Sequence, residues 1–117
     1  MEKPRIRHIA INVADREKCA EYYKQIFQME EKYRGPSGTI YLSDGHINLA
    51  ILPARNRREG IYHFGMQVED VKGATQTALA AGATGGTANL PKDGRFAETF
   101  VLDPVGTRVD LSPGWKV

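Results

Sequence analysis

The sequence predicts an α+β chain in which one strand-helix-strand-strand-strand module occurs twice. The main observation is an internal repeat, because residues 8–15 (HIAINVAD) match residues 63–70 (HFGMQVED) in chemical type at every position except Ala14 and Glu69. Both copies begin with a histidine, His8 and His63, and both end with an aspartate. In each copy, large apolar side chains alternate with small or polar ones, which predicts a half-buried strand. Each copy is then followed by a segment with helical periodicity, as expected for a duplicated module.

The first copy predicts five elements. Residues 5–13 form a strand, and Asp15 is the expected N-cap of a helix over residues 16–28. Three further strands are predicted over residues 30–34, 39–43 and 47–52, with turn residues between them. The apolar positions of the helix follow the i, i+3, i+4 stripe, so we expect them all in the core: Cys19, Tyr22, Tyr23, Ile26 and Phe27.

The second copy repeats this order. A strand is predicted over residues 61–68, and Asp70 is the expected N-cap of a helix over residues 71–81. A weaker strand pattern covers residues 84–90, and strands follow at residues 96–102 and 107–112 on either side of an Asp-Pro-Val-Gly turn. We therefore expect a single domain over residues 1–117, with modules at about 4–54 and 61–113 and a connector at about 54–60.

Composition limits the class of protein. The chain has 117 residues, a net charge of +2 and one cysteine, Cys19, so its fold does not depend on an internal disulfide. The basic residues Arg55, Arg57 and Arg58 are expected to be a solvated connector, because a nucleic-acid surface needs a broader basic stripe. No apolar run predicts a signal peptide or a membrane span. We expect a cytoplasmic protein that binds neither nucleic acid nor membrane.

The predicted strands carry polar side chains on the face away from the helices. His8 and Asn12 share this face in the first copy, and His63 and Gln67 share it in the second. Aligning the last strands of the two copies pairs Asn48 with Asp110 on the same face. A duplicated strand that begins with histidine would bring two imidazoles into one site. A single histidine at a strand start is more commonly structural, so the pairing is what favours a site.

Together these features resemble the vicinal oxygen chelate superfamily, which includes glyoxalases, bleomycin-resistance proteins and extradiol dioxygenases. The resemblance rests on the two modules, the paired histidine strands, the Tyr22-Tyr23 helix and the turn at residues 103–106, and it covers essentially the whole chain. It implies that the two modules form an open, cup-shaped mixed sheet with the helices outside. It also implies a homodimer.

The resemblance further implies a divalent metal, Fe, Mn, Zn or Ni, held by His8, His63 and Asp110. Asn48 stands where glyoxalase I-like members have a fourth ligand, a glutamate. The remaining set of two histidines and one carboxylate is similar to that of extradiol dioxygenases and fosfomycin-resistance thiol transferases. Such a set leaves about half of an octahedral metal's positions open for a chelating substrate. The candidate residues for the fourth position or for substrate contact are Asn48, Tyr41, Asn12 and Gln67.

The resemblance implies a metal-dependent enzyme acting on a small oxygenated molecule, by lyase, isomerase, thiol-transfer or ring-cleaving oxygenase chemistry. The alternative is a metal-free binding protein of the bleomycin-resistance type, whose cleft would use the aromatic residues Tyr41, Phe96, Phe100 and Trp115. A duplicated structural module without chemistry is a third hypothesis, which the complete set of His8, His63 and Asp110 disfavours. For Arg108, pairing near Asp110 and pairing with an anionic substrate are the alternatives, and a solvated surface position is favoured.

Overall fold

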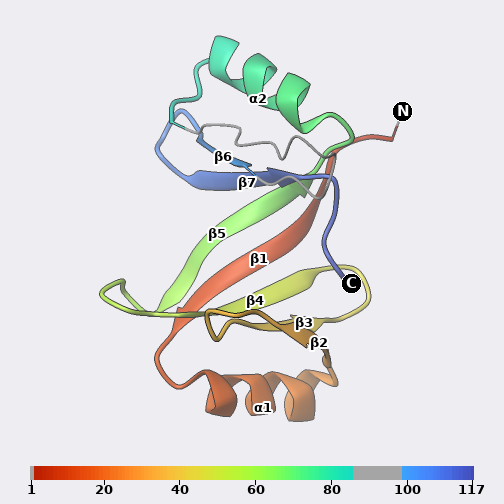
Figure 1. Cartoon of the computed structure of the whole chain (residues 1–117), viewed down its shortest axis with the longest axis vertical. Helices are drawn as coiled ribbons and strands as arrows, with labels where there is room; N and C mark the ends of the chain where they lie inside the picture. Colours follow the sequence, from red (N-terminus) through yellow and green to blue (C-terminus); the bar gives the residue numbers. More distant parts are fainter. Residues whose placement is uncertain (1, 86–98) are drawn as a thin grey trace. The chain divides into compact units, whose positions relative to one another are not determined.

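The computed structural model describes residues 2–85 and 99–117, which contain seven strands and two helices (Figure 1). The elements are β1 (Arg5–Val13), α1 (Arg16–Phe27), β2 (Glu30–Arg34), β3 (Ile40–Ser43), β4 (Asn48–Pro53), β5 (Gly60–Gln67), α2 (Val71–Ala80), β6 (Thr99–Leu102) and β7 (Arg108–Ser112). The α+β class is confirmed, and the strands pair in both parallel and antiparallel fashion. A strand was predicted over residues 84–90, and within it Thr84 pairs with Leu102 as an isolated bridge. Residues 86–90 of that prediction lie outside the described residues. The same is true of residues 96–98, the first part of the strand predicted over residues 96–102.

The chain contains two compact units. The first unit comprises His8–Tyr62 together with Lys116–Val117, and the second comprises the residues up to Arg7 together with His63–Trp115. The boundary therefore falls inside β1, just before His8, and inside β5, just before His63. No helix in the described ranges is long and apolar enough to cross a membrane.

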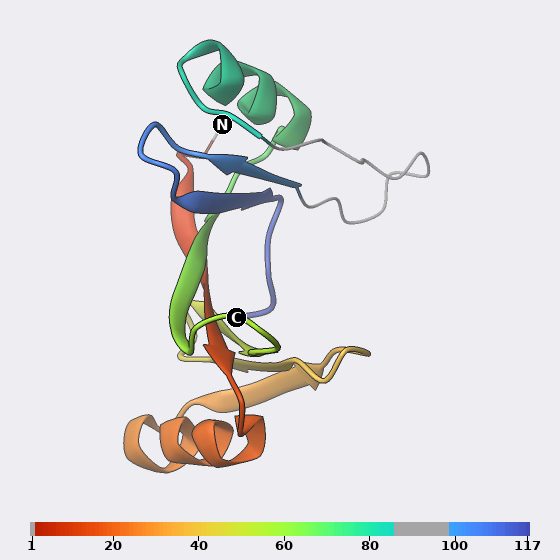
Figure 2. The same ribbon diagram turned by 90° about the vertical axis from the view of Figure 1, so that its left-hand side faces the viewer.

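In the first unit, four strands are ordered β2-β3-β4-β1. The β1–β4 pair is parallel, whereas β3 is antiparallel to both of its neighbours. In Figure 2, α1 lies on one side of β2–β4. Ile11 of β1, Ile40 and Leu42 of β3 and Ile51 of β4 form the buried cluster with Ala20 of this helix. The face of these strands on which His8 lies is therefore the one away from α1.

The second unit has the order β5-β7-β6, with β5 parallel and β6 antiparallel to β7. Val71 of α2 packs into a buried cluster with Val68, Val101, Val109 and Leu111. The helix begins at the Asp70 N-cap, whose carboxylate accepts from the backbone N–H of Gly73 at 2.9 Å. A Cβ at position 73 would overlap an oxygen of that carboxylate, so a larger residue there would require the Asp70 side chain to turn.

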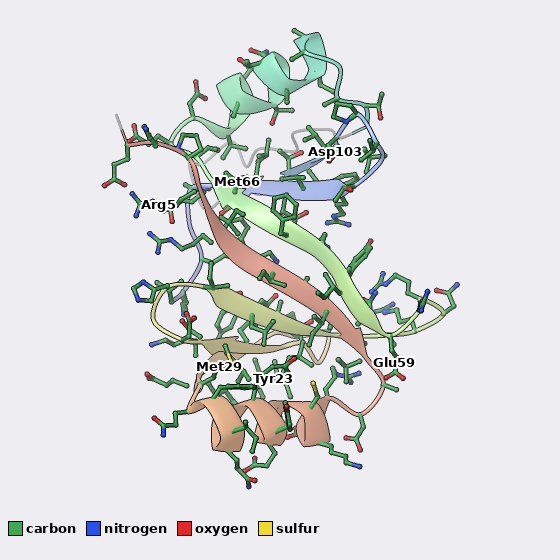
Figure 3. The ribbon with its side chains drawn as sticks, turned by 180° about the vertical axis from the view of Figure 1, so that it is seen from behind. Arg5, Tyr23, Met29, Glu59, Met66 and Asp103 are labelled. Carbon is green, nitrogen blue, oxygen red and sulfur yellow. The ribbon has the colours of Figure 1, made fainter. Side chains whose placement is uncertain are left out.

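The predicted packing of α1 is only partly correct. Tyr22, Ile26 and Phe27 are 53%, 58% and 59% exposed, so they do not belong to the buried core. The helix instead contacts its sheet through Ala20, which is 1% exposed, and through the partly buried Tyr23, which lies between α1 and the strands (Figure 3). The apolar stripe of α1 is therefore wider than the part of the helix that the sheet covers.

A charged network ties β2 to α1. Arg34 donates to both oxygens of Glu17, and its Nε donates to Glu31 at 3.0 Å. Lys24 donates to the other oxygen of Glu31 at 2.8 Å. The hydrogen bond from Arg34, followed by that from Lys24, lowers the pKa of Glu31 from 4.5 to about 2. A carboxyl whose pKa falls on folding stabilises the protein above its unfolded pKa and loses that contribution as pH falls.

We predict that Glu31→Gln lowers the free energy of unfolding at pH 7 by about 0.5–1 kcal/mol, because the network is near the surface. The difference from the wild type should disappear as pH falls from about 5 to about 2, where Glu31 becomes protonated in both states. Urea unfolding at several pH values measures this. Glu30→Gln is the matched control, since Glu30 is 75% exposed and pairs with Lys32 at 3.4 Å. A pH-independent difference for Glu31→Gln would contradict the prediction.

Candidate metal-binding residues

The first unit contributes His8 and Asn48. The parallel register of β1 and β4 pairs these two residues directly, and it continues with Ala10 opposite Ala50. His8 is 4% exposed and Asn48 is fully buried. Ile9 and Leu49, the next residues on the two strands, pack into the apolar cluster beneath α1. Because side chains alternate along a strand, those of His8 and Asn48 lie on the face away from α1.

The hydrogen bonds of Asn48 determine which nitrogen of His8 carries a proton. Asn48 Nδ2 donates to the main-chain carbonyl of Lys116 at 2.8 Å, which orients the amide because a carbonyl can only accept. Asn48 Oδ1 therefore faces His8 Nδ1, at 3.0 Å, and must accept from it. The neutral imidazole then carries its proton on Nδ1 and its lone pair on Nε2. A hydrogen-bond acceptor beside Nδ1 gives the same arrangement to a histidine that binds a metal through Nε2.

The second unit contributes His63 and Asp110. His63 Nε2 lies 2.9 Å from Asp110 Oδ2, and both side chains are almost completely buried. The β5–β7 register places Asp110 opposite Gly65, two residues from His63 on the same face. Arg108, two residues before Asp110 on β7, donates from Nε to Asp110 Oδ1 at 2.9 Å. The prediction that Arg108 is a solvated surface residue is therefore wrong.

Arg108 limits what Asp110 can do. Its guanidinium also lies 4.3 Å from the centre of the Phe100 ring, so it is held on two sides. Because Arg108 engages Oδ1, Asp110 presents Oδ2 to His63, which favours monodentate ligation. Period-two alternation in the sequence places Arg108 on the face of Asp110, and pairing near Asp110 is the alternative that the structure supports.

The His63–Asp110 pair fits a metal centre on geometric grounds. Two ligands about 2.1 Å from one cation, in adjacent octahedral positions, lie about 3 Å apart. The observed separation of 2.9 Å matches that edge, and imidazole with carboxylate suits Fe, Mn, Ni or Zn. The same distance also suits a direct hydrogen bond from His63 Nε2 to the carboxylate, so the pair can exist in both forms.

The other candidate residues all have protein partners. Tyr41 stacks on Tyr33, with ring centres 4.2 Å apart, and the register Tyr41–Ala50–Ala10 places it on the face of His8. Asn12 is 3% exposed and accepts from Arg57, while Gln67 accepts from Arg7 at 2.9 Å. Phe96 lies outside the described residues.

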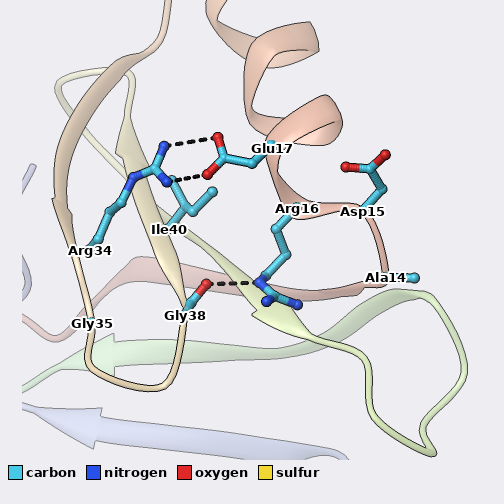
Figure 4. Close-up of a pocket in the computed structure, with 8 residues that line it drawn as sticks. All are labelled: Ala14, Asp15, Arg16, Glu17, Arg34, Gly35, Gly38 and Ile40. Carbon is cyan, nitrogen blue, oxygen red and sulfur yellow. Dashed lines mark hydrogen bonds and ion pairs between the residues drawn. The ribbon is translucent and has the colours of Figure 1, made fainter.

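Figure 4 shows a pocket of about 650 Å³ in the first unit, at the start of α1 and the β2–β3 turn. None of the candidate site residues lines it. Its two arginines are already engaged, since Arg34 pairs with Glu17 and Arg16 donates to the carbonyl of Gly38 at 2.8 Å. Because none of the predicted site residues lines this pocket and Arg34 is already paired with Glu17, its volume alone does not make it the functional site.

The surroundings of Cys19 in α1 disfavour a nucleophilic thiolate. Burial raises the pKa of its thiol, and the nearby carboxylates of Glu59 and Asp15 act in the same direction. The reactive thiolate form is therefore disfavoured.

A family model described as a glyoxalase-like domain matches residues 8–112. The chain belongs to this family. That membership confirms the resemblance to the vicinal oxygen chelate superfamily, and the matched segment begins at His8 and includes His63 and Asp110. No curated protein matches the sequence.

Solved structures are similar in fold. Methylmalonyl-CoA epimerase from Mycobacterium tuberculosis has a TM-score of 0.76 and 16% identity, over 95% of this chain and 88% of that one. A hypothetical protein from Bacillus halodurans C-125 has a TM-score of 0.75 and 16% identity, over 99% and 97%. A methylmalonyl-CoA epimerase in complex with methylmalonyl-CoA and NH4+ has a TM-score of 0.74 and 20% identity, over 99% and 98%.

We predict that the neutral His8 ring of the metal-free protein carries its proton on Nδ1, as the Asn48 contact requires. Long-range ¹⁵N–¹H NMR correlations distinguish the two tautomers. Asn48→Leu should shift His8 toward the Nε2–H form, because the acceptor for Nδ1–H is lost. Asn48→Asp keeps an acceptor at this place and should retain the Nδ1–H form. An unchanged pattern in Asn48→Leu would show that Asn48 does not select the tautomer.

Proposed function

We propose that this chain is a metal-dependent enzyme of the vicinal oxygen chelate superfamily, in which His8, His63 and Asp110 hold one divalent cation. The observation that carries the proposal is the buried His63–Asp110 pair, whose 2.9 Å separation equals the spacing of adjacent ligands. The tautomer of His8 supports it independently, because Asn48 leaves the lone pair on Nε2. Both histidines begin the repeated segments, residues 8–15 and 63–70, that first suggested a shared site.

The cation would act as a Lewis acid on substrate oxygens and so make a proton beside a carbonyl group more acidic. The protein's own residues would set the geometry. Asn48 holds the His8 ring, and Arg108 holds the Asp110 carboxylate with a single oxygen turned toward His63. Asn48 contributes orientation here and not a fourth ligand, since both ends of its amide are already used.

We further propose that the reaction is an isomerisation next to a carbonyl group, rather than ring cleavage with oxygen or a lyase reaction. The support is that several solved structures of the same fold are methylmalonyl-CoA epimerases, one of them in complex with methylmalonyl-CoA. Two imidazoles and one carboxylate leave positions for a chelating substrate, which that chemistry uses. The substrate would be a small oxygenated molecule, and the working form a homodimer.

Metal binding by the purified protein tests this proposal. After removal of metal with a chelator, calorimetric titration with Zn²⁺ or Mn²⁺ should give one ion per chain. We predict that His63→Ala, Asp110→Asn and His8→Ala each weaken binding by about 100-fold or more, because each removes one of three ligands. His46→Ala is the control, since His46 is exposed and lies in a turn.

A second candidate function is a metal-free binding protein, and one observation favours it. Asp110 already has two donors nearby, Arg108 and His63, so the acid is neutralised without a cation. In that case no metal binds at micromolar concentrations, and Asp110→Asn lowers the free energy of unfolding in the absence of any metal by about 3–5 kcal/mol. Stoichiometric metal binding that depends on all three residues would exclude this candidate.

A further inference from the structure

We infer that a pocket beside the C-terminal half of α1 is a binding site for a small organic cation with an apolar body, such as an alkylammonium ion. All residues that line this pocket belong to the first unit. They include Ile9 and Leu49, which face α1, whereas His8 lies on the opposite face of the same strands. The inference therefore assigns a second site to the chain and does not rest on the proposed metal centre.

The pocket has the size and the walls of a small-molecule site. Its volume is about 440 Å³, and Figure 3 shows Tyr23 and Met29 at this place, between α1 and the strands. Six large apolar or aromatic side chains form its walls: Ile9 of β1, Tyr23 and Phe27 of α1, Met29 before β2, Ile47 before β4, and Leu49 of β4. These walls can bury the hydrocarbon part of a ligand, and the flexible Met29 can adapt to its shape.

The helix side of the pocket is aromatic and remains exposed. The rings of Tyr23 and Phe27 have their centres 6.0 Å apart, and the ring of Tyr22 lies at the same distance from that of Phe27. Phe27 is 59% exposed although it lines an apolar pocket. Aromatic faces attract cations, and groups of such rings bind quaternary ammonium ligands in particular. The aromatic side of the pocket therefore favours a cationic ligand.

Asp44 is the charged residue among those that line the pocket. Its Oδ1 accepts from the backbone N–H groups of His46 and Ile47, both at 2.8 Å, so the carboxylate is held in the turn before β4. The hydrogen bond from Ile47, followed by that from His46, lowers the pKa of Asp44 below its usual value. The carboxylate is therefore ionised at neutral pH, and it adds one negative charge to apolar walls.

No lysine or arginine in residues 2–85 and 99–117 forms a salt bridge with Asp44, in contrast to Glu17 and Glu31, which both pair with Arg34. The two backbone hydrogen bonds end on Oδ1, so they leave Oδ2 for a further partner. A cationic ligand would compensate this charge, whereas an anionic ligand would be repelled by it. Charge complementarity and apolar walls together select an apolar cation.

NMR titration of the methionine methyl groups tests this inference. The chain has three methionines, of which Met29 lines the pocket and Met66 packs in the second unit. In protein labelled with ¹³C at these methyl groups, hexyltrimethylammonium should shift the Met29 signal at millimolar concentration and leave the Met66 signal unchanged. Hexanoate, which carries a negative charge on a similar chain, should bind about tenfold more weakly, and uncharged hexanol should lie between the two.

Asp44→Asn tests the contribution of the charge. The asparagine keeps an oxygen that accepts from the same backbone N–H groups, so the turn is retained while the charge is lost. We expect hexyltrimethylammonium to bind about threefold to fivefold more weakly, because the carboxylate is exposed. Asp103→Asn is the matched control, since Asp103 also accepts from two backbone N–H groups in a turn but does not line the pocket.

Phe27→Ala tests the aromatic side and should weaken binding about fivefold, because it removes both a ring face and apolar contact. Ile26→Ala is its control and should change the affinity less than twofold. Ile26 precedes Phe27 on α1 and is 58% exposed, but it does not line the pocket. Both side chains are more than half exposed, so α1 should remain folded in both variants, which thermal unfolding checks.

Three results would overturn the inference. The first is a Met29 signal that does not respond to hexyltrimethylammonium, and the second is an equal shift of the Met29 and Met66 signals, which indicates unspecific binding. The third is equal affinity for hexanol and the ammonium ion, or an unchanged affinity in Asp44→Asn, because the pocket would then bind apolar groups irrespective of charge. The titration uses no metal, so its outcome is independent of the metal-binding test of the proposed function.

Discussion

The parallel pairing of β1 with β4 is the constraint on which the first half of the candidate centre depends. This register puts His8 directly opposite Asn48, and period two then puts Ala10, Ala50 and Asn12 on the same face. A shift of one residue would turn all of these side chains toward α1 and expose the isoleucines that now pack against it. The apolar cluster and the polar face are therefore two results of one register, and the burial of Ile11 and Ile51 is what stabilises the position of His8.

The second half depends on a comparable pairing, between β5 and β7, but its electrostatics differ. Here a buried carboxylate needs compensation, and Arg108 and His63 provide it from opposite sides of the Asp110 carboxylate. His8 instead faces a neutral amide, which orients the ring without adding charge. The two duplicated histidines therefore have different neighbours, an amide at His8 and a carboxylate at His63. Only the second module supplies a negative charge that a cation could use.

Much of this arrangement could be predicted from the sequence. The repeat of His8 and His63, together with alternation along each strand, predicted the elements and which side chains share a face. The helix faces were less predictable, because the stripe that includes Tyr22 and Phe27 is apolar and yet both side chains are more than half exposed. The contacts of Arg57 were also beyond sequence reasoning, because nothing distinguishes it from Arg55 and Arg58 until the connector folds back toward Asn12 and Tyr62.

The acceptor that orients Asn48 is a main-chain carbonyl, that of Lys116, while the Lys116 ammonium lies 4.7 Å from the centre of the Tyr33 ring. Every amino acid supplies the same carbonyl, so exchanging the side chain at this position leaves the amide oriented. A family alignment would then record position 116 as freely variable, even though its backbone helps to set the imidazole. Residue-by-residue variation is thus a poor guide to this part of the protein, and deletion or esterification of the peptide unit would be needed to reveal its contribution.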